Sequence, residues 1–102
     1  MESLTPRQRL CHKLRDGAYR ARRMGCPVTV VKISDADELL AQTNCYYCDV
    51  ELGELYTLEH KKPLAKGGAH DLANICKACP ACNETKHIQD ELDYVARLDL
   101  AS

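Results

Sequence analysis

Four of the seven cysteines stand in two pairs of equal spacing, and this pattern is typical of metal binding. Cys45 and Cys48 are separated by two residues, as are Cys79 and Cys82, and thirty residues lie between the pairs. Each pair can chelate an ion through a tight turn, and four thiolates form the closed tetrahedral ligand set of a structural zinc site. The spacing therefore predicts a Zn²⁺ ion at these four cysteines, with metal binding coupled to folding.

The other three cysteines, Cys11, Cys26 and Cys76, lack this spacing. A free cysteine packs like a small apolar residue, and we expect that of all three. Cys76 lies close enough to the second pair in the sequence to compete as a ligand.

An acidic residue and a histidine, Glu59 and His60, lie between the cysteine pairs, and Asn83 directly follows the second pair. A neutral imidazole can accept a proton from water at cellular pH. One carboxylate and one amide oxygen are hard ligands that leave water positions open, which favours Mg²⁺ or Mn²⁺ over a second zinc. These residue types suit phosphodiester hydrolysis, where a cation stabilises the developing charge. An adjacent acid and histidine are common on surfaces, so the pair alone is a weak signal.

The wider stretch resembles the HNH endonucleases, a family of ββα-metal nucleases. The matching residues are Cys45-Tyr-Tyr-Cys48, Glu59-His-Lys-Lys-Pro-Leu-Ala-Lys-Gly-Gly68, Asn74-Ile75 and Cys79-Pro-Ala-Cys-Asn-Glu-Thr-Lys86, and they span about 40 of the 102 residues. The resemblance implies a small α+β fold. Its ββα-metal (HNH) core would be held by a four-cysteine zinc site and flanked by N- and C-terminal helices.

The resemblance also implies a role for each polar residue of the motif. His60 matches the general base that activates water, and Glu59 matches a ligand of the catalytic Mg²⁺ or Mn²⁺ ion. Asn74 matches a residue whose amide holds the active-site loop in place, and Asn83 matches the second metal ligand. Position 59 is Glu where the family more often has Asp, and position 83 is Asn where it often has His. Both departures bear on metal preference.

The implied function is metal-dependent hydrolysis of DNA, by nicking or by double-strand cleavage. Small HNH proteins are frequent in bacteria and their phages, so the implied location is the cytoplasm of a bacterial cell or an infected host. Besides DNA, the implied partners are a second copy of the chain or a larger phage or host nucleoprotein complex.

Two alternatives without catalysis compete with this interpretation. One is a zinc-stabilised nucleic-acid-binding module, and the other is a protein-interaction module that docks a partner through the acidic segment from Asp35 to Glu54. Neither alternative requires the set Glu59, His60 and Asn83.

The composition favours one small domain with a metal-assisted core. An apolar core in 102 residues gives little stability by itself. Phe and Trp are absent and only five Tyr are present, so aromatic burial is small. No signal-peptide pattern follows Met1 and no run of about 18 apolar residues occurs, so neither secretion nor a membrane partner is expected. Reduced cysteines at this spacing indicate metal rather than disulfides.

The net charge of −1 conceals strong segregation along the chain. Residues 1–33 carry eight Lys or Arg against two acids, whereas residues 34–58 carry six acids and no base. A basic segment of this density suits a phosphate backbone as partner. We expect Arg20, Arg22, Arg23 and Lys86 to contact DNA. The alternative is that residues 6–24 form a solvated basic helix that only covers the core.

Local patterns predict the elements that position these residues. Thr5 and Pro6 predict the start of a helix that runs to about residue 24, with Gly17 weakening its middle. Ser34 is expected to cap a second helix ending near 43–44, and Pro80 to begin a third. Strands are expected over 28–33 and 55–60, and a final helix after Ile88. Residues 1–44, 45–87 and 88–102 are then three parts of one structural domain.

These elements leave one geometric conflict. Along a strand over 55–60, Glu59 and His60 point to opposite faces, so both can serve one metal only if the pleat fails at the strand end. On the helix from Pro80, Asn83 shares a stripe with the second cysteine pair. His70 and His87 are auxiliary candidates, although a surface position is expected for each.

Overall fold

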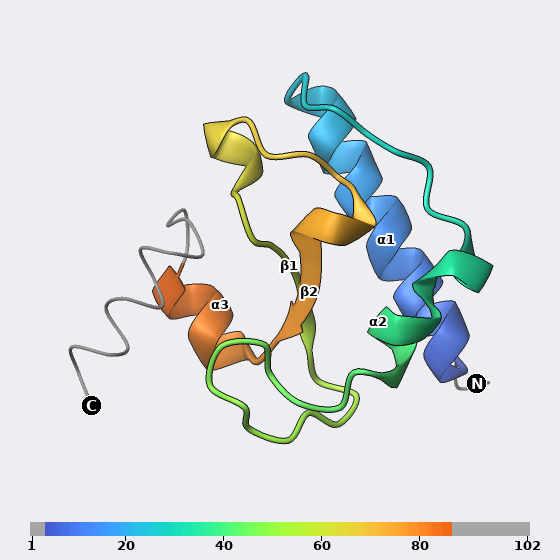
Figure 1. Ribbon diagram of the computed structural model, residues 1–102, viewed down its shortest axis with the longest axis vertical. Coiled ribbons are helices and arrows are strands. Elements are labelled where there is room, and N and C mark those ends of the chain that lie inside the picture. The colour runs from blue at the N-terminus through green and yellow to red at the C-terminus, as the bar shows by residue number, and fades with distance from the viewer. Residues whose placement is uncertain (1–3, 87–102) are drawn as a thin grey trace.

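The computed structural model describes residues 4–86, and it shows a two-stranded antiparallel sheet with helices packed against it (Figure 1). Strand β1 (Thr57–His60) pairs with β2 (Ile75–Ala78). Helices α1 (Pro6–Arg23) and α3 (Pro80–Lys86) both contact β1, and α2 (Asp37–Ala41) packs against α1. The expected small α+β fold is confirmed, because β1, β2 and α3 follow one another in ββα order.

Helix α1 begins and ends where the sequence predicts. Thr5 Oγ1 accepts a hydrogen bond from Gln8 N, and Gln8 Oε1 accepts one from Thr5 N, which completes a capping box. Met24 is the C-cap and Gly25 follows with a positive φ of 74°. The face that carries Leu10 and Leu14 is buried, so the basic helix covers the core as well as presenting charge to solvent.

Two clusters of buried side chains hold the fold. The first joins α1 to the sheet and to the segment around α2, and it comprises Leu10, Leu14, Ala36, Leu39 and Ile75. The second is built around three of the paired cysteines and Ala78, with Tyr47 and Leu52 packed against it. An apolar core therefore covers one part of the sheet, and a thiol-rich cluster completes the other.

The strand expected over 55–60 is present but shorter, since Leu55 is 83% exposed and pairing begins at Thr57. Its partner β2 was not predicted. All four residues of β2 are buried, so its sequence has none of the alternation that marks a half-exposed strand. Its outer edge is covered by Gln42, whose side-chain amide donates to Lys77 O (2.9 Å) and accepts from Lys77 N (3.1 Å).

The prediction of a strand over 28–33 is wrong. Only Val28 forms a β-bridge, to His70, and the backbone bonds there are His70 N to Pro27 O and Thr29 N to His70 O. Val30 is 76% exposed, and the chain turns into a 3₁₀ helix at Ile33–Ala36. β-branched residues here make an extended connection rather than a strand.

The expected cap of the second helix is also wrong. The 3₁₀ turn occupies Ser34, and α2 starts at Asp37 after Ala36, with no side chain capping it within the described chain. Asp37 and Glu38 do lie in its first turn, where their charge complements the helix dipole. The helix ends at Ala41, earlier than expected.

The predicted helix from Ile88 and the position of His87 lie outside the described residues, as does the end of the predicted 45–87 core. Within residues 4–86, none of the helices combines the length and the apolar character needed to cross a bilayer.

Candidate functional site

The two cysteine pairs meet in space, as their spacing predicts. The Sγ atoms of Cys45, Cys48, Cys79 and Cys82 all lie within 4.8 Å of one another, and those of Cys48 and Cys79 are 3.7 Å apart. Zn–S bonds of about 2.3 Å in a tetrahedron place sulfurs about 3.8 Å apart. The cluster therefore has the dimensions of a four-thiolate metal site.

Two local structures present these thiols. The first pair lies in a tight hairpin, where Asp49 N donates to Cys45 O and Cys45 N donates to Val50 O. The turn closes through Asp49, which adopts a positive φ of 63°. The second pair lies at the start of α3, where Cys82 N points at Cys79 Sγ (3.4 Å). Cys79 N points in turn at Cys45 Sγ (3.4 Å), which ties the two turns together.

The environment of Cys45 favours the thiolate that a metal requires. Burial raises the pKa of this thiol, but hydrogen bonds from the backbone of Cys48, Cys79 and Tyr47 outweigh that effect and lower the pKa to about 7. Cys76 differs, because burial raises its pKa to about 11 and its Sγ contacts Tyr47 Oη (3.9 Å). Cys76 thus stands apart from the four-cysteine cluster and packs as a buried thiol.

A second candidate site is a cleft of about 460 Å³ between α1, the end of β1, the loop after it and α3. Three of the residues expected to do chemistry, Glu59, His60 and Asn83, line this cleft together with Arg20. The sequence places these residues on three different elements. The fold brings them to one opening beside the cysteine cluster.

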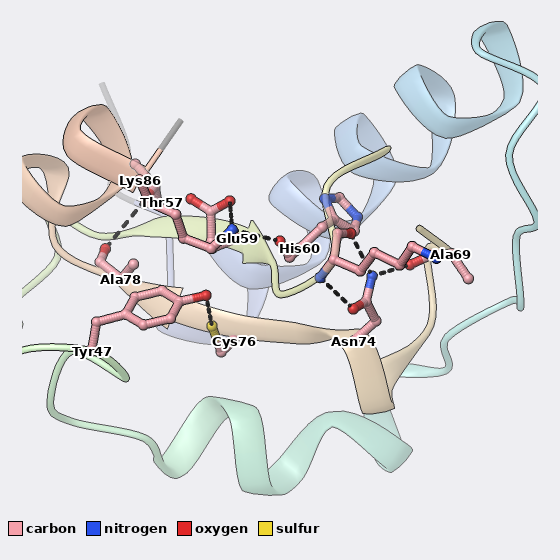
Figure 2. Close-up of polar contacts among 10 residues, drawn as sticks. Tyr47, Thr57, Glu59, His60, Ala69, Asn74, Cys76, Ala78 and Lys86 are labelled. Atoms are coloured by element: carbon pink, nitrogen blue, oxygen red, sulfur yellow. Dashed lines mark hydrogen bonds and ion pairs between the residues drawn. The ribbon is translucent and has the colours of Figure 1, made fainter. Parts of the chain in front are cut away.

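Glu59 is a buried acid with an incomplete set of partners. Lys86 Nζ lies 3.5 Å from Glu59 Oε1 and donates to His60 O at 3.2 Å (Figure 2). Oε2 is buried and finds no hydrogen-bond partner among residues 4–86. Burial raises the pKa of Glu59, and the nearby Lys86 ammonium opposes that rise. An unpartnered buried carboxylate oxygen in a polar cleft is the feature expected of a metal ligand.

His60 is held as a neutral imidazole. The side chain is buried, and its Nε2 lies 3.0 Å from His70 Nδ1. Burial lowers the pKa of His60 to about 4, with further lowering from the neighbouring His70, Arg20 and Lys86. A ring that stays neutral at cellular pH is able to accept a proton from water.

Asn74 makes the contacts that a loop-holding residue requires. Its Oδ1 accepts from Lys62 N (2.8 Å), and its Nδ2 donates to Lys62 O (3.1 Å) and Ala69 O (2.8 Å), as Figure 2 shows. These bonds fasten both ends of the loop that follows His60. Gly68 completes the turn, because a Cβ atom there would collide with the carbonyl oxygen of Lys62.

Glu59 and His60 are covered by different elements at the end of β1. Both residues are buried, so the strand loses its alternation there. The α3 residue Lys86 covers Glu59, and α1 covers His60, where a Cβ at Gly17 would lie 3.7 Å from the ring. Neighbouring side chains therefore contact different helices and still line one cleft.

The basic residues expected to contact DNA occupy different surroundings. Arg20 is exposed and lines the cleft, whereas Arg22 lines a separate cavity of about 240 Å³ between α1 and residues 28–31. The Arg23 guanidinium lies 5.9 Å from the centre of the Tyr19 ring. Lys86 is fully buried, so its ammonium faces Glu59 rather than an approaching phosphate.

The surroundings of two residues at the site were not predicted. His70 was expected at the surface but is only 2% exposed, and Gly17 was interpreted merely as a weak point of α1. A Cβ at Gly17 would lie 2.7 Å from His70 Cε1, so the glycine makes room for that ring. A glycine inside a strong helix pattern is the one sequence signal that pointed to close packing there.

The arrangement of β1, β2, α3 and the thiol cluster defines a ββα-metal core. Residues 45–89, just under half of the chain, match the family model described as HNH endonuclease. This segment is therefore an HNH endonuclease domain, and its four paired cysteines are positioned to bind a metal ion. No curated protein matches the chain.

The thiol cluster yields the first prediction. Cys79→Ser removes a thiol that lies against Cys48 of the hairpin and Cys82 of α3. The protein is therefore expected to lose its zinc and its cooperative thermal transition. Metal analysis and a circular-dichroism melt measure both effects. Cys11→Ser, a half-buried thiol outside the cluster, is the matched control and should retain both. An unchanged melt for Cys79→Ser would show that the cluster is not structural.

The burial of Lys86 yields the second prediction. Lys86→Met leaves the Glu59 carboxylate buried without its counter-charge, and the free energy of unfolding is expected to fall by about 3–5 kcal/mol. Lys66→Met, which changes an exposed lysine, should have no such effect. Urea denaturation of the zinc-loaded protein measures the difference. Full stability combined with weaker DNA binding would instead assign Lys86 to a phosphate contact.

Proposed function

We propose that this protein is a metal-dependent endonuclease that hydrolyses phosphodiester bonds of DNA. The observation that carries the proposal is the cleft shared by Glu59, His60 and Asn83, in which one buried carboxylate oxygen lacks a partner among the described residues. The HNH domain match over residues 45–89 supports a function of the nuclease kind.

The donor set in the cleft fits a hard divalent cation. Glu59 Oε2 is buried without a hydrogen-bond partner among residues 4–86, and Asn83 offers an amide oxygen from the first turns of α3. Oxygen ligands of this kind prefer Mg²⁺ or Mn²⁺, in contrast to the four sulfurs of the neighbouring cluster. Bound there, such an ion would neutralise charge on the phosphate and on the leaving oxygen.

The chain's own residues supply the remaining chemistry. His60 is the general base that accepts a proton from the attacking water, which its lowered pKa permits over the whole physiological range. Asn74 fixes the loop after His60 and so holds the ring relative to the cleft. Arg20, at the mouth of the cleft, is placed to pair with a DNA phosphate.

Zinc at the four cysteines serves a structural role in this proposal. Four protein ligands close the coordination sphere, so no position remains for substrate. The zinc-loaded turn instead fixes the start of α3, and Asn83 N donates to Cys79 O one turn later (3.0 Å). The turn that carries Cys79 is thus hydrogen-bonded directly to Asn83, the second proposed metal ligand of the cleft.

The non-catalytic alternatives account for less of the structure. A zinc-held binding module needs the thiol cluster and a charged surface, but it has no need for a buried acid with an open oxygen beside a neutral histidine. The same proposal covers the setting, the reaction and the assembly. It places the protein in a bacterium or a phage-infected host, has it nick DNA or cut both strands, and allows a homodimer or a larger nucleoprotein complex.

Plasmid cleavage tests the proposal. The zinc-loaded protein should nick or cut supercoiled plasmid in Mg²⁺ or Mn²⁺, and His60→Ala should slow cleavage by about 10²- to 10⁴-fold while zinc content and melting stay unchanged. Asn83→Ala should stay folded and require more Mg²⁺ for the same rate. His12→Ala, at an exposed histidine, is the control.

Undiminished cleavage by His60→Ala would remove this residue as the base. Absence of cleavage by the wild-type protein across a series of metals and DNA forms would favour the binding-module alternatives.

A further inference from the structure

The buried histidine His70 is the most constrained titratable group that the proposed reaction leaves unused. It follows the Gly67-Gly68 turn and is 2% exposed. Its main chain is fixed on both sides, because His70 N donates to Pro27 O and His70 O accepts from Thr29 N. The ring is therefore positioned by the backbone and is not a surface group that happened to fold inward.

The ring of His70 touches the proposed base. His70 Nδ1 lies 3.0 Å from His60 Nε2, and the ring centres are 5.3 Å apart. Both side chains are buried, so water does not compete for this hydrogen bond. In a pair of neutral imidazoles one nitrogen must donate and the other accept, so the bond fixes one tautomer of each ring.

The same contact leaves one nitrogen of His60 for the proposed reaction. His60 Nε2 faces His70, so the nitrogen left to accept a proton from water is Nδ1. A neutral ring carries one N–H, and Nδ1 is a base only when that proton is on Nε2. In the competent pair His60 Nε2 therefore donates and His70 Nδ1 accepts.

The consequence passes to His60. If His70 Nδ1 accepts, His60 Nε2 carries the proton and donates it, which leaves His60 Nδ1 with a free lone pair. We propose that His70 is a positioning residue that, by accepting this hydrogen bond, holds His60 in the tautomer whose Nδ1 can take a proton from water. The inference rests on the proposed role of His60 as general base.

Helix α1 contributes to the site through Gly17. A Cβ there would approach His70 Cε1 to 2.7 Å and Nδ1 to 3.1 Å. A glycine in a helix interior is unfavourable relative to alanine, but here it lets the helix backbone approach the His70 ring closely. The basic helix thus packs against the ring that contacts the proposed base, in addition to covering the core.

The tautomer is measured without any cleavage assay. Long-range ¹H–¹⁵N spectra of the zinc-loaded wild-type protein at neutral pH identify which imidazole nitrogens carry protons, and a His60→Gln spectrum assigns the signals. We expect a proton on His60 Nε2 and none on Nδ1. A proton on His60 Nδ1, or rapid averaging between the two tautomers, would overturn the proposal.

Two variants test the effect on turnover. His70→Leu keeps an apolar side chain without an acceptor, and the cleavage rate at saturating DNA is expected to fall by about 10- to 100-fold with DNA affinity unchanged. His70→Asn places an amide oxygen near the position of Nδ1 and should restore most of the rate. Equal rates for wild type and His70→Leu would overturn the role.

The outcomes separate this inference from the proposed function. An inactive wild-type protein with the expected His60 tautomer would contradict the nuclease proposal alone, whereas an active protein with the opposite tautomer would contradict only the role of His70.

Discussion

The fold depends on the contact between two thiol-bearing turns. Cys79 N points at Cys45 Sγ, and Cys82 N points at Cys79 Sγ, so the protein's own hydrogen bonds join the hairpin at 45–48 to the start of α3. Four thiols gathered in this way repel one another as thiolates, and a divalent cation removes that cost. With neither Phe nor Trp in the chain, the cluster takes the place of a large aromatic core.

The position of α3 controls the candidate active site. The helix carries Asn83 to the cleft and directs Lys86 onto Glu59 and the carbonyl of His60. Burial raises the pKa of Glu59, and the buried ammonium of Lys86 opposes that rise. The other side of the site is formed by α1, through Gly17 and the ring of His70. The end of β1 is thus held between two helices that come from opposite ends of the described chain (Figure 1).

The gathering of the cysteines was more predictable from the sequence than the elements around it. The cysteine spacing and the Glu59-His60 pair are local patterns whose chemistry depends on residue type, and the expected gathering of the cysteines is confirmed. Helix α1 was predicted because its cap and stop signals are local. The strand at 28–33 failed because β-branched residues show extended backbone but cannot show whether a partner strand exists. β2 was missed because its four residues are all buried.

The burial of His70 and Lys86 could not be predicted from the sequence. Only the packing of α1 and α3 shows that both side chains are buried against the cleft residues. Polar groups placed by contacts between distant segments leave no periodic signal.

In the proposed mechanism Glu59 and Asn83 form a cation site beside a neutral His60. A Mn²⁺ titration of the zinc-loaded protein, followed by the electron paramagnetic resonance signal of free Mn²⁺, tests this site most directly. One Mn²⁺ per chain is expected to bind to the wild-type protein, and Glu59→Gln should weaken binding by about tenfold or more. Glu84→Gln, which alters an exposed acid of the same cleft, should bind Mn²⁺ as the wild type does. Unchanged Mn²⁺ binding by Glu59→Gln would contradict the assignment of this cleft as the catalytic metal site.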